Sequence, residues 1–99
     1  MNSSDASLDE SDEILAELLT LTMSVDAFGT TIYRNHLGQR HRIHGPAVFR
    51  EDGWVLWYKN NNLHRMDGPA MCYPSGIVCW FINGDQLTEE EFNEQVKSI

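Results

Sequence analysis

An internal repeat constrains the fold of this 99-residue chain more than any other feature. Residues 41–63 read HRIHGPAVFREDGWVLWYKNNNL, and residues 64–86 read HRMDGPAMCYPSGIVCWFINGDQ. Nine of these 23 paired positions are identical. A third, less similar copy includes residues 29–35, GTTIYRN, and reaches His41 through a turn that is one or two residues longer. A repeat of this period predicts one supersecondary unit, copied in tandem, whose neighbours bury a shared apolar face.

Each copy predicts a β-hairpin followed by a second turn. Residues 47–50 are β-prone, and the turn after them ends in Asp-Gly, where glycine accepts the positive φ of a tight hairpin. A return strand over 54–59 precedes three asparagines, which tolerate a left-handed backbone. The second copy repeats this order with strands over 70–73 and 77–82. The pattern predicts an antiparallel meander of about five or six strands.

Both faces of this predicted sheet are mostly apolar. Alternate residues of the return strands place Trp54, Leu56, Tyr58, Ile77, Cys79 and Phe81 on one face, and Val55, Trp57, Lys59, Val78, Trp80 and Ile82 on the other. A sheet with one solvated face would alternate apolar and polar residues, so each face here needs a cover. The cover is expected to be the chain's own helices, a second copy of the chain or a partner protein.

An amphipathic helix is predicted over residues 7–23. Ser7 and Glu10 have the spacing of a capping box, and an apolar stripe follows at helical spacing, made of Ile14, Leu15, Leu18, Leu19 and Thr22. Two interpretations are open for this helix. It packs within the protein or its homo-oligomer, or it docks on a foreign partner.

A second helix is predicted near the C-terminal end. Thr88 and Glu91 form a capping box, and one face carries Phe92, Val96 and Ile99, which we expect to pack on the sheet. The fold class is therefore α+β, an antiparallel meander of tandem hairpins with a helix at each end. Residues 1–26 are an acidic tail and amphipathic helix, 27–87 the repeat sheet, and 88–99 a capping helix.

Charge is distributed unevenly along the chain, whose net charge is −8. Residues 1–26 hold seven acidic and no basic residues, and residues 85–99 hold five acidic residues and one lysine. Residues 27–84 hold six basic and three acidic residues together with all four histidines. This asymmetry concerns partners rather than fold. The net charge of −8 disfavours nucleic acid as a partner, although acidic ends that mimic nucleic acid are an alternative.

Composition narrows the class of protein. The hydrophobic fraction of 41% excludes wholesale disorder, and no apolar run approaches the ~20 residues of a membrane span. The acidic start, MNSSD, lacks the features of a secretory signal, so a cytoplasmic location is expected. Cys72 and Cys79 are expected to be small packed thiols rather than a disulfide.

No constellation of catalytic residues is recognisable, so an enzyme is not expected. The histidines lack the cysteine or carboxylate partners of a spaced metal site, and neither a metal nor another cofactor is expected. Histidine and arginine instead recur at equivalent repeat positions, next to the Gly-Pro pairs. We expect these residues to be structural, with hydrogen bonds to the Gly-Pro turn of the neighbouring hairpin; they are His41, Arg42, Gly45, Pro46, His64, Arg65, Gly68 and Pro69.

The repeat resembles the MORN-like repeats, in the variant group of YwqK-like antitoxin-component proteins and small bacterial and tailed-phage proteins. The resemblance covers about residues 29–87 and is carried by HRIHGPA at 41–47, HRMDGPA at 64–70, Asp52-Gly53 and the aromatic pairs at 57–58 and 80–81. Such repeats serve as scaffolds or binding surfaces. The resemblance implies an inhibitor or adaptor that acts on a host or anti-phage defence protein.

The most economical functional hypothesis is a non-enzymatic protein-binding module. Interface energy concentrates in aromatic residues and in apolar helix faces, so the candidate anchors are Trp54, Trp57, Tyr58, Trp80, Leu15, Leu18 and Leu19. The alternative is a homo-oligomeric scaffold in which the same residues form a dimer core.

Overall fold

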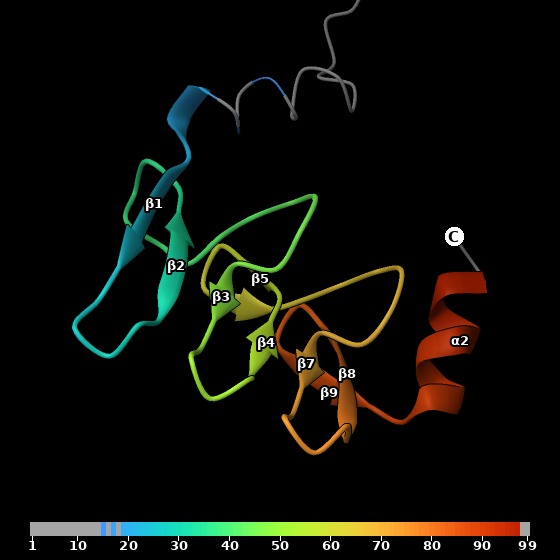
Figure 1. Cartoon of the computed structure of the whole chain (residues 1–99). Helices are drawn as coiled ribbons and strands as arrows, with labels where there is room; N and C mark the ends of the chain where they lie inside the picture. The colour runs from blue at the N-terminus through green and yellow to red at the C-terminus, as the bar shows by residue number, and fades with distance from the viewer. Residues whose placement is uncertain (1–14, 16, 18, 98–99) are drawn as a thin grey trace, which may run out of the picture.

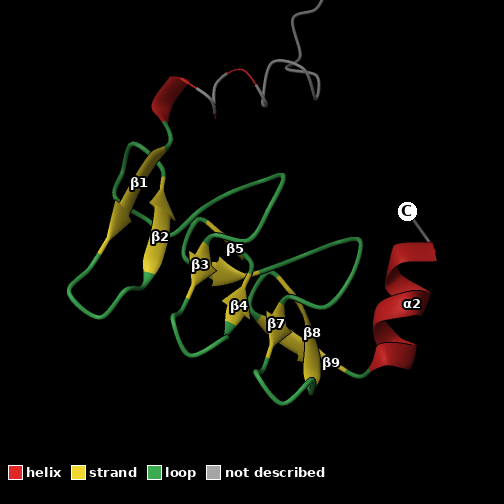
Figure 2. Cartoon of the chain, viewed as in Figure 1, coloured by secondary structure: helices red, strands yellow, loops and turns green. Residues whose placement is uncertain are grey.

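Nine strands and a C-terminal helix are formed by the part of the chain that this computed structural model describes, residues 15, 17 and 19–97 (Figure 1). The strands are β1 (Thr22–Val25), β2 (Thr31–Arg34), β3 (Val48–Phe49), β4 (Val55–Leu56), β5 (Tyr58–Lys59), β6 (Asn62–Leu63), β7 (Met71–Cys72), β8 (Val78–Ile82) and β9 (Asp85–Leu87), and the helix is α2 (Glu89–Lys97). Seven strands form one sheet in the order β1-β2-β3-β4-β7-β8-β9, and β5 and β6 form a second (Figure 2). The expected antiparallel sheet with a C-terminal helix is confirmed.

The hairpin turns follow the predicted turn chemistry. Gly53 has φ 103° and Gly76 has φ 97°, conformations that a residue with a Cβ rarely adopts. Each turn closes by the same backbone bonds, from Arg50 N to the Trp54 carbonyl at 3.0 Å and from Tyr73 N to the Ile77 carbonyl at 2.8 Å. Asparagines with positive φ make the second turns, at Asn60, Asn61 and Asn83.

The prediction of one continuous return strand over 54–59 is wrong. It divides at Trp57 into β4, which pairs with β3 and β7, and β5, which pairs with β6. Trp57 lies between them because its N–H donates to the Ala70 carbonyl at 2.7 Å while its own carbonyl accepts from His64 N at 3.0 Å. In the second copy β8 stays continuous but also changes partner, from β7 at Val78 and Cys79 to β9 at residues 80–82. This division gives more strands than the five or six expected.

The predicted boundary at the N-terminal side of the sheet is also wrong. Residues 22 and 23, placed in a helix from the sequence, lie in β1, which pairs with β2 along its whole length. The sheet therefore begins at residue 22 and not at residue 27. Leu15, Glu17, Leu19 and Thr20 have helical backbone, whereas the rest of the predicted first helix lies outside the described residues.

The hydrophobic core lies at the middle of the sheet and is small. Ala47, Val48 and Leu56 are buried, and partly buried side chains pack around them from neighbouring strands, namely Ile32, Trp54, Tyr58, Leu63 and Met71. The molecule extends 51 × 36 × 16 Å, and its radius of gyration is 15.1 Å, against about 13 Å for a compact domain of this length. A sheet this thin leaves much apolar surface without a second layer.

Helix α2 covers one end of the sheet. Phe92 is 4% exposed and its ring centroid lies 6.5 Å from that of Trp80 on β8. Val96 is half-buried, so two of the three predicted packing residues face inward, and Ile99 lies outside the described residues. The predicted capping box is confirmed by two reciprocal bonds between Thr88 and Glu91. None of the helices in the described residues is long and apolar enough to cross a membrane.

Candidate functional site

Two loops, 41–46 and 64–69, extend from the sheet in the same direction (Figure 1). Each begins with a histidine whose Nδ1 accepts a backbone N–H from the following asparagine turn, Asn60 N to His41 at 3.0 Å and Asn83 N to His64 at 2.9 Å. A neutral ring that accepts at Nδ1 carries its proton on Nε2. Burial lowers the pKa of both imidazoles and Lys59 lowers it further, while Glu17 acts in the opposite direction on His41.

The arginine after each histidine holds its own loop. Nη1 of Arg42 donates to the Pro46 carbonyl at 3.3 Å, and Nη1 of Arg65 donates to the Pro69 carbonyl at 3.1 Å. The glycine of each loop makes room for this crossing, because a Cβ on Gly45 or Gly68 would lie 2.9 or 2.8 Å from the guanidinium carbon. The arginines therefore bond the Gly-Pro turn as expected, although in their own loop, whereas the histidines bond the asparagine turn instead.

The aromatic residues predicted as anchors are half-buried, and each contacts an arginine or another ring of the same chain. The guanidinium carbon of Arg65 lies 3.9 Å from the ring centroid of Trp57, and that of Arg40 lies 4.1 Å from that of Tyr58. Trp54 lies between Arg50 and the ring of Tyr73, whose centroid is 4.2 Å away. Trp80 packs on Phe92 of α2. These rings are thus covered by arginines or by other rings rather than presented to solvent.

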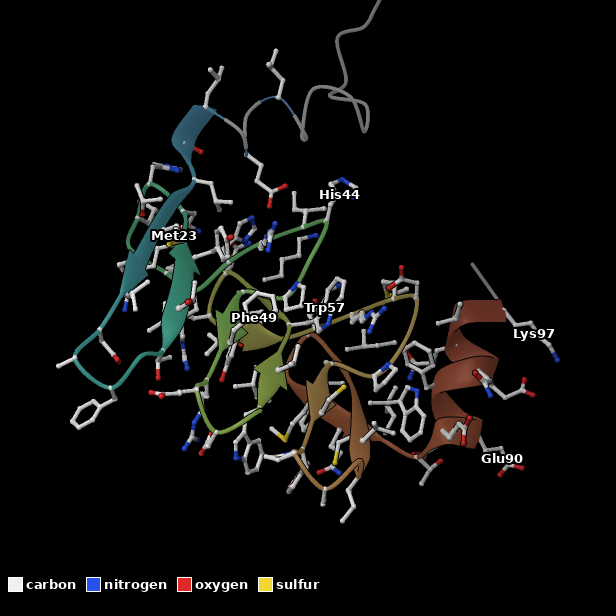
Figure 3. All side chains as sticks on the ribbon, viewed as in Figure 1. Met23, His44, Phe49, Trp57, Glu90 and Lys97 are labelled. Atoms are coloured by element: carbon white, nitrogen blue, oxygen red, sulfur yellow. The ribbon has the colours of Figure 1, made fainter. Side chains whose placement is uncertain are left out.

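A cleft of about 360 Å³ lies between the two loops. Figure 3 shows His44 at the tip of the first loop and Trp57 below it. The cleft is lined by three cationic side chains, two imidazoles, three apolar side chains and one carboxylate, namely Arg42, Lys59, Arg65, His44, His64, Ile43, Trp57, Met66 and Asp67. The sequence did not single out this cleft, because Lys59 stands 17 residues from Arg42 and only the loop geometry brings them to one cavity.

Large apolar side chains are exposed along β1 and the residues that flank it. We call this set the N-terminal edge; its exposed fractions are Leu15 56%, Leu19 76%, Met23 57%, Val25 60% and Phe28 82%. Two of the predicted anchors, Leu15 and Leu19, belong to it, while Leu18 lies outside the described residues. Glu17 points the other way, because it is 8% exposed and its Oε1 accepts the N–H of Ile43 at 2.6 Å.

Metal-binding geometry is not found in the described part of the chain, where no group of three histidine, cysteine, aspartate or glutamate side chains is placed to hold an ion. Cys72 and Cys79 are free thiols of intermediate burial on neighbouring strands.

Comparison with protein-family models, curated proteins and solved structures finds no match to this chain. The N-terminal edge and the cleft are therefore the two candidate functional surfaces of the described residues.

Proposed function

We propose that this protein is a non-enzymatic protein-binding module that pairs an extended segment of its partner with the edge strand β1. The observation that carries this proposal is the exposure of all four residues of β1 at the open end of the seven-stranded sheet. An unpaired strand edge is a template for another chain, a mode of recognition known as β-augmentation.

The backbone groups that such a partner would use can be named. Tyr33 N donates to the Ala47 carbonyl, so the backbone polar groups of Tyr33 face β3 rather than β1. Antiparallel pairs alternate between bonded and non-bonded, so Met23, which lies opposite Tyr33, turns its N–H and carbonyl outward. Val25, two residues further along β1, also turns its N–H and carbonyl outward. Edge strands often carry a charge, a proline or a bulge, which prevents them from pairing with another chain. Strand β1 contains none of these three features.

The residues before β1 support the same proposal. Leu15 and Leu19 have helical backbone and are exposed, whereas Glu17 between them is buried against the 41–46 loop. An amphipathic helix that packed for its own stability would turn leucines inward and glutamate outward. The exposed side chains of Leu15 and Leu19 instead leave apolar surface next to β1, and an apolar surface of this kind marks an interaction site.

Charge favours a foreign partner over a second copy. Residues 1–26 carry seven acidic and no basic residues, and β1 lies at the end of that segment. Pairing β1 with β1 of another copy would bring two such segments together, and like charges at an interface oppose association. The proposed partner therefore presents an extended apolar segment flanked by basic residues. A host or anti-phage defence protein is the kind of partner that the MORN-like resemblance implies.

We further propose that residues 27–87 are tandem copies of one MORN-like hairpin unit that displays this edge. Support comes from bonds that recur 23 residues apart, such as Ala47 N to the Leu56 carbonyl and Ala70 N to the Cys79 carbonyl, both at 2.9 Å. The pairing of β5 with β6, Tyr58 opposite Leu63, recurs as Phe81 opposite Gln86. The first turn is one residue longer, since His41 N bonds to Tyr33 whereas His64 N bonds to Trp57.

The test begins with the full chain as bait in a lysate of its native cells and continues with each captured protein in purified form. Met23→Lys is expected to weaken binding by about tenfold or more, because it places a charge in the centre of the paired edge. Ile77→Lys is the matched control, since Ile77 is exposed to a similar extent, 60%, in a different hairpin. Hydrogen exchange of the Met23 and Val25 amides is expected to slow in the complex.

Two outcomes would overturn the proposal. Equal binding by the Met23→Lys variant and the unchanged chain would remove the edge from the interface. Light scattering that shows a dimer, with Met23 and Val25 protected in the protein alone, would make a second copy the occupant.

A further inference from the structure

We propose that the cleft between loops 41–46 and 64–69 is a second binding site, which takes an oxyanion, phosphate or carboxylate, carried on a small apolar or aromatic body. This inference is independent of the proposed function, since the cleft is formed by residues other than those of the N-terminal edge. Its volume, about 360 Å³, is within the range of small-molecule sites.

The polar groups in the cleft are almost all hydrogen-bond donors. Arg42, Arg65 and Lys59 are cations without acceptor atoms, and the neutral ring of His64 has its acceptor, Nδ1, occupied by Asn83 N. The single carboxylate, Asp67, is already bonded to Nε of Arg65 at 2.8 Å. A cavity that offers donors and positive charge selects an anion with several acceptor oxygens.

The arginines keep N–H donors that their own loops do not use. A guanidinium has five N–H groups. The bond to Pro46 uses one of those on Arg42, and the bonds to Asp67 and Pro69 use two of those on Arg65. Stacking on Tyr33 and Trp57 fixes both planes, because the guanidinium carbons lie 4.1 and 3.9 Å from the ring centroids. The remaining donors are therefore held in place before a ligand arrives, which lowers the entropy lost on binding.

The two copies of the repeat differ at two cleft positions, and both differences make the cleft more positive. The position of Lys59 is taken by Ile82 in the following copy, so the hairpin does not require a lysine there. Among the described residues the side chain of Lys59 makes no hydrogen bond or ion pair, although its backbone belongs to the β5–β6 pair. The position of Asp67 is taken by His44 in the first loop, which leaves Arg42 without the carboxylate that Arg65 has. Neither departure is needed to hold a loop, and both favour an anion.

The net charge of −8 does not exclude an anion at this site. The acidic residues are concentrated at the two ends of the chain, and residues 27–84 carry an excess of three positive charges. At physiological ionic strength the screening length is about 8 Å, so distant acids act weakly while contacts within the cleft keep their strength. Glu17 is the acid of the N-terminal segment that contacts the first loop, and its Oε1 already accepts the N–H of Ile43 at 2.6 Å. Ile43, Met66 and Trp57 supply an apolar wall for the body of the ligand.

The test compares three compounds with one aromatic body and different heads, phenyl phosphate, phenylacetate and 2-phenylethanol. Binding to the full chain is followed by the NMR signal of the Trp57 indole N–H, assigned with a Trp57→Phe variant. We expect at least one anion to shift this signal with a Kd on the order of 1 mM or lower, and the neutral alcohol to leave it in place. The stronger of the two anions identifies the head group as phosphate or carboxylate.

Lys59→Ala is the informative variant and Lys97→Ala, at the exposed end of α2, is the matched control. We expect the first to weaken the anion by about tenfold, the loss of one charge-assisted hydrogen bond, and the second to leave the affinity unchanged. The proposal is overturned by any of three results: neither anion binds, the alcohol binds as well as the anions, or Lys59→Ala binds as well as the unchanged chain. None of these results bears on the β1 edge.

Discussion

Arg40, Arg42, Arg50 and Arg65 each lie over an aromatic ring, with the guanidinium carbon 3.9 to 5.4 Å from the ring centroid. In a protein with two packed layers, such rings would be covered by apolar side chains of the second layer. Here the planar guanidinium covers the ring, gains a cation–π interaction and keeps its edge in contact with water. In this way arginines cover aromatic rings in a molecule that is only 16 Å across in its shortest dimension.

Replacing Arg65 by lysine tests this arrangement at its most connected position. The variant loses the stack on Trp57, the bond to the Pro69 carbonyl and the fixed bond to Asp67. We expect the free energy of unfolding to fall by about 1–2 kcal/mol, because a lysine is a point charge that cannot satisfy all three at once. Urea unfolding at pH 7 measures the change.

The comparison for that prediction is Arg50→Lys, because the guanidinium carbon of Arg50 lies farther from its ring, 5.4 Å from the centroid of Trp54. Arg50 and Asp52 pair at 2.9 Å, but both side chains are about half exposed, 47% and 52%. Such surface pairs contribute little, so we expect a change within about 0.5 kcal/mol. Equal losses for Arg50→Lys and Arg65→Lys would contradict a special role for the loop arginines.

His41 and His64 make stability depend on pH. Both rings have a pKa lowered from 6.5, first by burial, so the unfolded chain takes up protons more readily than the folded chain as the pH falls through 6.5. Their contribution is complete above pH 6.5 and is lost below it. We therefore expect the free energy of unfolding to decrease from pH 7.5 to pH 5.5, measured by urea midpoints at constant ionic strength.

Variants separate these rings from other titrating groups. The His41→Gln, His64→Gln double variant should show a flatter dependence over that interval. His36→Gln, at an exposed position, should retain the slope of the unchanged protein. A slope that is the same in the double variant and the unchanged protein would assign the pH dependence to other groups.

Among the elements, helix α2 shows that a short sequence motif, here the capping box, can specify where a helix begins. Thr88 Oγ1 accepts the N–H of Glu91 at 3.1 Å, and Glu91 Oε1 accepts the N–H of Thr88 at 2.8 Å. Thr88→Ala removes one of these bonds, and we expect it to lower the free energy of unfolding by about 1 kcal/mol, as other N-caps do. Thr88→Ser keeps the hydroxyl and should stay within about 0.5 kcal/mol of the unchanged protein. Thermal unfolding followed by circular dichroism compares them, and equal losses would contradict a capping role for the hydroxyl.

The hairpin turns and the capping box could be predicted from sequence because each depends on residues within a few positions of one another. Strand β1 could not, although Thr22-Met23-Ser24-Val25 alternates polar and apolar residues, because so short an alternation is outweighed by the longer helical pattern that precedes it. Thr22 continues a leucine stripe at helical spacing, and Met23 is the last residue of the helix predicted over 7–23. The division at Trp57 depends on Ala70 and His64, which a local pattern does not reveal.

The candidate sites were predictable to the same limited extent. The repeat pointed to the histidine and arginine of each loop, and both make hydrogen bonds in the structure, His41 with the N–H of Asn60 and Arg42 with the Pro46 carbonyl. The aromatic residues were chosen as anchors for their residue type, but the exposure of Tyr58 and Trp57 depends on Arg40 and Arg65, which approach from segments outside the strands. Lys59 carried no local signal, because its role follows only from the cavity between two loops.

As a whole molecule, the protein is a row of hairpins rather than a packed globule. The buried residues Ala47, Val48, Leu56 and Ala70 lie on or next to the middle strands, whereas β1 at the open end is exposed throughout. Each hairpin pairs with its neighbours in the sheet order, as in repeat proteins where stability is a sum of local terms. Terminal units in such arrays have a single neighbour and open at lower free energy than central ones.

Native-state hydrogen exchange tests this gradient along the row. The amides of Ala47, Trp57 and Ala70, which donate to the Leu56, Ala70 and Cys79 carbonyls, are expected to exchange only through global unfolding. The paired amides of Thr22 and Ser24 should exchange through opening of the β1–β2 hairpin, at least about tenfold faster, equivalent to 1.4 kcal/mol or more. The unpaired amides of Met23 and Val25 should exchange faster still. Equal protection of Thr22, Ser24 and the central amides would mean that the sheet opens as one unit, and that β1 is as stable as the core despite its exposure.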